Sequence, residues 1–242
     1  MNNSPNIGKM KIFNSSITLM LMWLLVACGE QTTVQEAPQA ISEAEENDMD
    51  DTPVVLFFGN SLTAGYGLDP DESFPGILQQ WFDSAGVEVR VVNAGVTGET
   101  TATGKNRVEW VLSQQRVDVF VLELGGNDGL RGIPTEETAR NLRDIIAVVR
   151  NKQPNAAIVL AGMMVPPNMG QEYSADFERI FPDVAASEQV ALIPFLLEGV
   201  AGEAHLNLPD GIHPNREGQR IVAKTVWPFV APLIENEKGK RP

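Results

Sequence analysis

From residue 53 onward, short runs of apolar residues alternate with longer amphipathic stretches. The apolar runs are rich in branched side chains and lack an alternation of polar and apolar positions, as is typical of strands buried on both faces. They predict strands over residues 54–58, 87–92, 117–124, 156–161 and 190–194. The amphipathic stretches predict helices over residues 73–85, 105–113, 135–151, 172–187 and about 216–234.

This alternation of strands and helices predicts an α/β fold, a three-layer α/β/α sandwich around a five-stranded parallel sheet. The roughly 190 residues of segment 53–242 suit one domain with a substantial core. Ligands of such sheets bind beyond the carboxyl ends of the strands. Three polar segments directly follow predicted strands and are therefore expected to share one edge of the sheet, namely residues 59–61, 93–95 and 125–128.

The first residues have the character of a targeting segment. Lys9 and Lys11 precede an apolar stretch over residues 17–27, which is shorter than a helix that crosses a membrane requires. The stretch ends in Leu-Val-Ala-Cys-Gly, and its cysteine, Cys28, is the only one in the chain. This ending resembles a bacterial lipoprotein signal. The resemblance implies that residues 1–28 are a signal segment and that Cys28 is lipidated. A free or buried thiol, or an uncleaved anchor helix, is the alternative.

Residues 29–52 are expected to form an acidic, disordered linker. Eight acidic side chains and no Lys or Arg occur between residues 30 and 52, and such a segment cannot bury enough apolar surface to offset its ordering entropy. More than half of the chain's net charge of −14 therefore belongs to this linker. The remaining residues are only moderately acidic, which predicts no nucleic-acid partner. We expect a monomer, anchored by its lipid to a membrane of the bacterial cell envelope, in the periplasm or at the outer membrane.

The strongest candidate chemistry lies near the end of the chain, at Asp210 and His213. The chain has only one other histidine, His205, so His213 is the main candidate for a general base. A serine hydrolase needs an imidazole base and a carboxylate that orients it, and three positions of spacing allow both to lie in one loop. Ser61 follows the first predicted strand and is the candidate nucleophile. Taken alone, a serine in this position is more often a turn or cap residue.

Attack on an ester also requires hydrogen-bond donors for the oxyanion. Gly95 offers a backbone N–H without a side chain that would block a substrate. Asn127, which lies in a Gly-Gly-Asn-Asp run, offers a neutral side-chain amide. Taken alone, each of these segments indicates no more than a turn.

Together, these segments resemble the SGNH, or GDSL-type, hydrolase family. The four sequence motifs of that family occur in the same order here, at residues 59–62, Gly95, residues 125–128 and residues 210–213. The resemblance covers essentially all of residues 53–234. It is closest to the periplasmic branch of thioesterases, lysophospholipases and arylesterases, which residues 122–132 and 210–215 match almost residue for residue.

The resemblance implies a flavodoxin-like hydrolase domain over residues 53–242 that cleaves aryl esters, lysophospholipids or acyl thioesters through an acyl-enzyme. It implies Ser61 as nucleophile, His213 as general base and acid, and Asp210 as the orienting carboxylate. It implies an oxyanion hole made by the Ser61 and Gly95 N–H groups and the Asn127 side chain. No metal ion and no organic cofactor are expected, and the implied partner is a small-molecule or lipid ester.

One departure from the family pattern is Asn60, which stands where aspartate is usual. Because the orienting carboxylate is Asp210, we expect the enzyme to remain active. Residues 163–170 are expected to determine substrate specificity, because their methionines suit an acyl chain. The alternative is that this segment is the edge of the core leading into a surface loop. Candidate substrate contacts are Met164, Pro166 and Leu208. Two other functions fit the same residues. One is a carbohydrate O-deacetylase, and the other is a non-catalytic surface lipoprotein, in which Asn60 would be an early step in the loss of catalytic activity.

Overall fold

The computed structural model describes residues 52–238. The predicted signal segment, its lipidation site Cys28 and, apart from Thr52, the predicted linker lie outside the described residues. Within residues 52–238, no helix combines the length and the apolar character that crossing a bilayer requires.

Five strands form one parallel sheet, as predicted. They are β1 (Val54–Gly59), β2 (Arg90–Gly95), β3 (Val119–Glu123), β4 (Ala157–Ala161) and β5 (Ala191–Ile193). Their spatial order is β2-β1-β3-β4-β5, so that β1 and β3 lie side by side near the middle of the sheet. All residues of β1 and β3 are buried, which explains their continuous apolar runs.

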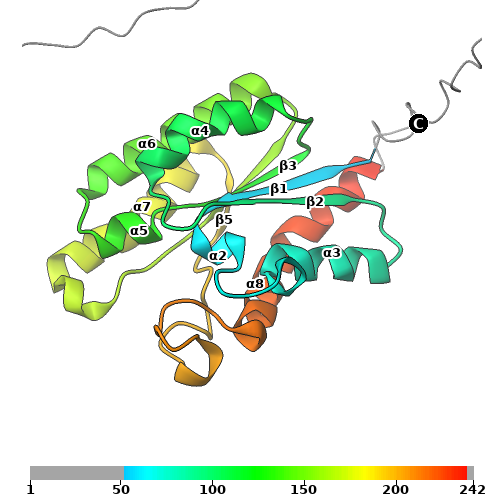
Figure 1. Cartoon of the computed structure of the whole chain (residues 1–242). Coiled ribbons are helices and arrows are strands. Elements are labelled where there is room, and N and C mark those ends of the chain that lie inside the picture. The colour runs from blue at the N-terminus through cyan, green and yellow to red at the C-terminus, as the bar shows by residue number, and fades with distance from the viewer. Residues whose placement is uncertain (1–51, 239–242) are drawn as a thin grey trace, which may run out of the picture. The chain divides into compact units, whose positions relative to one another are not determined.

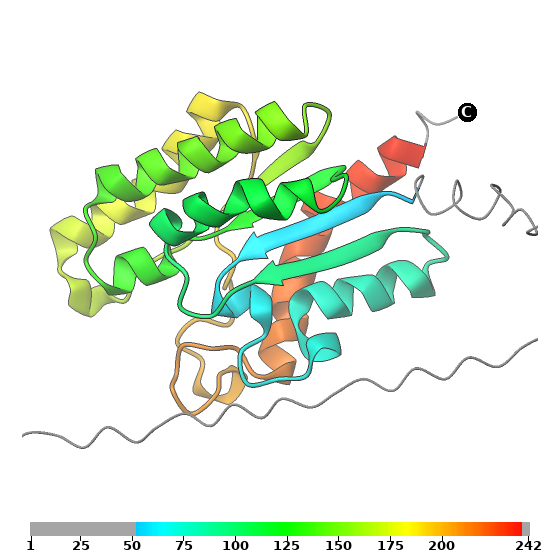
Figure 2. The same ribbon diagram turned by 45° about the horizontal axis from the view of Figure 1, so that its top comes forward.

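Helices cover both faces of the sheet, which confirms the three-layer architecture. Helices α3 (Phe74–Ser84) and α8 (Arg216–Lys238) pack together on one face, and α4 (Thr101–Ser113), α6 (Thr135–Lys152) and α7 (Gln171–Glu188) cover the other (Figures 1 and 2). Two short helices, α2 (Ser61–Ala64) and α5 (Gly126–Leu130), follow the carboxyl ends of β1 and β3. Single-turn 3-10 helices lie at Pro70–Glu72, Pro167–Met169 and Ala204–Leu206.

Several boundaries differ from the sequence predictions, and two of these differences lie close to the site. The second strand was expected over residues 87–92, but β2 extends to Gly95, which pairs with Gly59. Because β2 lies at the edge of the sheet, it tolerates the polar Asn93 within its hydrogen-bonded ladder. The polar residue therefore does not coincide with the end of the strand. Helix α4 begins four residues earlier than expected, because Thr100 forms a capping box with Thr103 and the helix continues through Gly104.

Candidate active site

Ser61 lies where β1 ends and helix α2 begins. Asn60 caps this helix, since its side-chain Oδ1 accepts the Leu62 N–H at 2.9 Å. The Ser61 side chain is buried, with 6% of the residue exposed. Among the described residues, the Ser61 N–H makes no hydrogen bond. The turn therefore presents a hydroxyl and a free backbone donor from the same residue.

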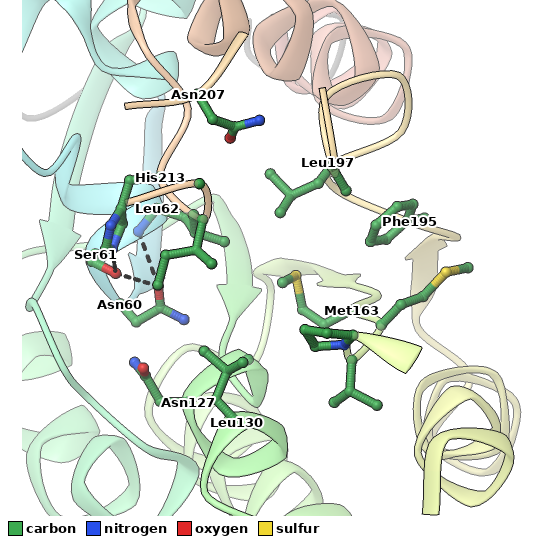
Figure 3. Close-up of a pocket in the computed structure, with 18 of the residues that line it drawn as sticks. Asn60, Ser61, Leu62, Asn127, Leu130, Met163, Phe195, Leu197, Asn207 and His213 are labelled. Atoms are coloured by element: carbon green, nitrogen blue, oxygen red, sulfur yellow. Dashed lines mark hydrogen bonds between the residues drawn. The ribbon is translucent and has the colours of Figure 1, made fainter. Parts of the chain in front are cut away.

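The structure brings Ser61, His213 and Asp210 into one hydrogen-bonded chain. His213 Nε2 lies 2.9 Å from Ser61 Oγ (Figure 3). On the other side of the ring, His213 Nδ1 lies 2.8 Å from Asp210 Oδ2. Because a carboxylate accepts only, the Nδ1–H donates to Asp210, which leaves Nε2 free to accept the serine proton. The Tyr66 ring packs against the imidazole, with ring centroids 4.5 Å apart. This arrangement can activate a serine for nucleophilic attack.

Asp210 also builds the loop that carries His213. Its Oδ1 accepts the backbone N–H groups of Ile212 at 3.0 Å and His213 at 3.1 Å. The loop is closed by the Leu208 N–H, which donates to the His213 carbonyl at 2.7 Å. The hydrogen bond from the His213 side chain, followed by that from the Ile212 N–H, lowers the pKa of Asp210 below its ordinary value. The Asp210 carboxylate is therefore charged at neutral pH.

The structure does not support Gly95 as an oxyanion donor. Its N–H donates to the Asn93 side-chain Oδ1 at 3.0 Å and is therefore already engaged. A Cβ at this position would lie closer than 3.0 Å to the Ala64 backbone. Gly95 is a glycine because β2 and α2 approach each other closely here, which is a packing requirement.

Gly98, which sequence reasoning missed, has the properties expected of that donor. Its φ is +80°, and a Cβ there would meet nothing within 4 Å. No acceptor for its N–H is found among residues 52–238. The neighbouring Glu99 carbonyl accepts a hydrogen bond from Asn127 Nδ2 at 2.9 Å, which ties this turn to Asn127. The available signal is a second glycine three residues after Gly95, whereas the prediction of Gly95 rests on its position directly after the predicted strand.

Asn127 lies in α5, and its side chain lines the pocket beside Ser61 (Figure 3). A side-chain amide has two N–H groups, so the bond to Glu99 leaves one of them for a ligand. Glu99 is held in turn by an ion pair with Arg107, whose guanidinium also donates to the Ala94 carbonyl at 2.9 Å. This network fixes the orientation of the Asn127 amide.

A cavity of about 650 Å³ opens beside Ser61 and His213. Met164 and Pro166, two of the predicted substrate contacts, line it. Leu208 does not line the cavity, since its side chain instead lies against Gly67. Met163 and Val165, which belong to the predicted specificity segment 163–170, line the cavity as well. Sequence reasoning did not identify the remaining apolar side chains of the lining: Leu62, Leu130, Phe195, Leu197, Ala201 and Ile212.

No metal-binding cluster of three or more His, Cys, Asp or Glu side chains occurs in the described part of the chain. His205, the second histidine, is exposed and has the Glu203 carboxylate 3.7 Å away. It does not line the cavity. Ser61 and His213 of the triad line the cavity, Asp210 reaches it only through the imidazole, and Glu178 is the carboxylate among the lining residues.

Comparison with known proteins agrees with this geometry. Residues 57–221 match the GDSL-like lipase/acylhydrolase family. The chain is 38% identical over 180 residues to Esterase TesA of Pseudomonas aeruginosa, covering 74% of this chain and 89% of that protein. It is 35% identical over 183 residues to Thioesterase 1/protease 1/lysophospholipase L1 of Escherichia coli (strain K12), covering 76% and 86% of the two proteins.

A solved crystal structure of TesA resembles this chain along the same region. The TM-score is 0.71 at 38% sequence identity, and the match covers 74% of this chain and 99% of that one. The family match begins at Phe57, within β1, and ends within α8. This chain belongs to the GDSL-like lipase/acylhydrolase family.

Proposed function

We propose that this chain is a serine hydrolase that cleaves carboxylic esters and thioesters of short-to-medium acyl chains through an acyl-enzyme. The observation that carries this proposal is the chain of hydrogen bonds from Ser61 through His213 to Asp210, at 2.9 and 2.8 Å. The protein's similarity to Esterase TesA and to Thioesterase 1/protease 1/lysophospholipase L1 supports the proposal. All residues of the site come from one chain, so a monomer is expected to be active.

In the first half of the reaction, Ser61 Oγ attacks the acyl carbon while His213 Nε2 takes the hydroxyl proton. Asp210 stabilises the imidazolium that forms. The oxyanion receives hydrogen bonds from the Ser61 N–H, the Asn127 amide and, in place of Gly95, the Gly98 N–H. His213 then protonates the departing alcohol or thiol. In the second half, a water molecule attacks the acyl-enzyme, again with His213 as base, and Ser61 is released.

The apolar cavity supports an acyl chain as the recognised part of the substrate. Each buried methylene contributes about 0.8 kcal/mol, so a chain that fills the cavity gains affinity over acetate. We expect kcat/KM for 4-nitrophenyl octanoate to exceed that for the acetate by about 10- to 100-fold. The measurement is a panel of aryl esters, acyl thioesters, lysophospholipids and acetylated glycans.

A variant can test the cavity independently of the chemistry. Leu130 is 42% exposed at the cavity wall, so Leu130→Trp can narrow the cavity without disturbing the core. It is expected to reduce octanoate hydrolysis and leave acetate hydrolysis within about twofold. A wild-type preference for acetyl groups, with acetate release from acetylated glycans, would instead identify a carbohydrate O-deacetylase.

We also propose that Cys28 carries a lipid anchor and that residues 29–52 tether the domain to the membrane of the cell envelope. The Leu-Val-Ala-Cys-Gly ending and the acidic composition support this. A flexible segment of this length spans roughly 27 Å on average, which would keep lipid esters of the same membrane within reach. Cys28→Ser is expected to abolish palmitate labelling and move the protein to the soluble fraction. Retention in the membrane fraction by this variant would contradict the proposal.

A further inference from the structure

Glu123 is a buried carboxylate directly behind the turn that carries Ser61. It is the last residue of β3, opposite Gly59 in β1, and none of its surface is exposed. The triad does not include it. A charged group in such a place is costly unless hydrogen bonds satisfy it, so its partners indicate what it does.

The partners of Glu123 all belong to the turn around Ser61. One carboxylate oxygen, Oε1, accepts the Asn60 side-chain Nδ2–H at 2.7 Å. The other, Oε2, accepts the Asn60 backbone N–H at 3.0 Å and the Thr63 hydroxyl at 2.8 Å. The carboxylate therefore fixes the residues on both sides of Ser61.

Gly59 provides the space for this contact. A Cβ at position 59 would lie closer than 3.0 Å to both the Thr63 hydroxyl and a Glu123 carboxylate oxygen. Its φ is not positive, so a left-handed conformation does not explain the glycine. The absence of a side chain at Gly59 is what lets the carboxylate reach the turn.

The charged groups on the surrounding elements have partners of their own. Asp128 of α5 accepts hydrogen bonds from Thr101, and Glu99 pairs with Arg107 of α4. On the side of α2, the nearest ionisable pair is His213 with Asp210. Burial raises the pKa of Glu123 to about 7, while the hydrogen bonds from Thr63 and Asn60 oppose this increase. The carboxylate thus depends on neutral donors of the turn for its stabilisation.

We propose that Glu123 is a positioning residue for the hydrolysis, which acts through Asn60 to hold Ser61 against His213. This inference rests on the proposed serine mechanism. By accepting the Asn60 Nδ2–H, Glu123 directs the amide oxygen toward the Leu62 N–H at 2.9 Å. The same oxygen lies 3.4 Å from Ser61 Oγ, whereas His213 Nε2 lies at 2.9 Å. At these distances, the histidine is the better acceptor for the hydroxyl.

The hydrogen-bond pattern predicts how exchanges of amide and carboxylate behave. Glu123→Gln places an NH2 group against the NH2 of Asn60, so one donor loses its acceptor. Asn60→Asp places two carboxylates in contact, which must share a proton. In the double variant, the amide that replaces the Glu123 carboxylate can donate to the new carboxylate at position 60. Its oxygen can still accept from the backbone N–H and from Thr63, so every hydrogen bond of the native turn is restored with the roles exchanged.

The test measures kcat and KM against pH for the wild type, both single variants and the double variant. Rates are normalised to the active fraction by fluorophosphonate titration. We expect Glu123→Gln to lower kcat at least tenfold above pH 7, where the wild-type carboxyl is ionised, with KM within about threefold. Adding Asn60→Asp to this variant is expected to return kcat to within about threefold of the wild type. Asn60→Asp alone should remain active at neutral pH. It should lose activity above pH 7, where the two carboxyl groups at positions 60 and 123 give up the proton they share. The double variant should keep its activity above pH 7.

The matched control is Asp118→Asn, which neutralises a carboxylate at the opposite end of β1. Asp118 accepts the Val54 N–H at 2.8 Å, and its replacement is expected to change kcat less than twofold. Wild-type kcat in Glu123→Gln, or a double variant no faster than that single variant, would overturn the positioning role. An unlabelled and inactive wild type would instead refute the serine mechanism on which it rests.

Discussion

Ser61→Ala is expected to lower kcat/KM for an activated aryl ester by about 10⁴- to 10⁶-fold. In serine hydrolases of this arrangement, removal of the nucleophile leaves only the catalysis supplied by binding and the oxyanion donors. Ser61 Oγ is the hydroxyl within 2.9 Å of His213 Nε2, and the alanine cannot form an acyl-enzyme. The measurements are kcat/KM on 4-nitrophenyl butyrate and the mass increase after treatment with a fluorophosphonate. The wild type should gain one adduct and the variant none.

Two variants show whether this loss belongs to the nucleophile. Ser84→Ala changes an exposed hydroxyl at the end of α3 and is expected to retain full activity. Asn127→Ala keeps the nucleophile and removes one oxyanion donor, which costs about 10²- to 10³-fold in kcat, so it should still react with the fluorophosphonate, more slowly. Full activity of Ser61→Ala would exclude the serine mechanism. A wild type that neither hydrolyses esters nor reacts with the probe would favour a non-catalytic binding lipoprotein.

The parts of this site that follow one another in the sequence could be predicted. Asp210 and His213 lie within one loop, so their spacing alone brings the carboxylate to the imidazole. Ser61 follows a buried strand of a parallel sheet, and the position of its turn at the carboxyl edge follows from that architecture. The five apolar runs identified the five strands for the same reason, because strands covered on both faces need apolar side chains throughout.

What depends on contacts between distant segments could not be predicted. Gly95 and Gly98 both follow the second strand as predicted from the sequence, and only the hydrogen bond from Gly95 to Asn93 shows which N–H is already engaged. Leu208 is close in sequence to Asp210, yet its side chain packs against Gly67, away from the cavity. Glu123 lies within an apolar run and shows no sign of function in the sequence. Its role became visible only because the register of β1 and β3 sets it beside Gly59.

Asp210→Asn is expected to lower kcat by about 10⁴-fold while leaving the fold and KM nearly unchanged. The asparagine oxygen can replace Oδ1, which accepts the N–H groups of Ile212 and His213, so the loop keeps its hydrogen bonds. The amide NH2 then faces His213 Nδ1, which must become an acceptor. The ring proton moves to Nε2, where it points at Ser61 Oγ, and the serine loses its base.

The measurements for this variant are kcat, KM and the melting temperature, with His205→Ala as the control. His205 is exposed and lies outside the cavity, so its replacement should leave kcat within about twofold. Asp210→Ala should lose the same activity and also stability, because it removes the acceptor for both backbone N–H groups. An Asp210→Asn variant with nearly wild-type kcat would show that the carboxylate only shapes the loop, and that the orientation of the imidazole is set elsewhere, with the packing of Tyr66 as the next candidate.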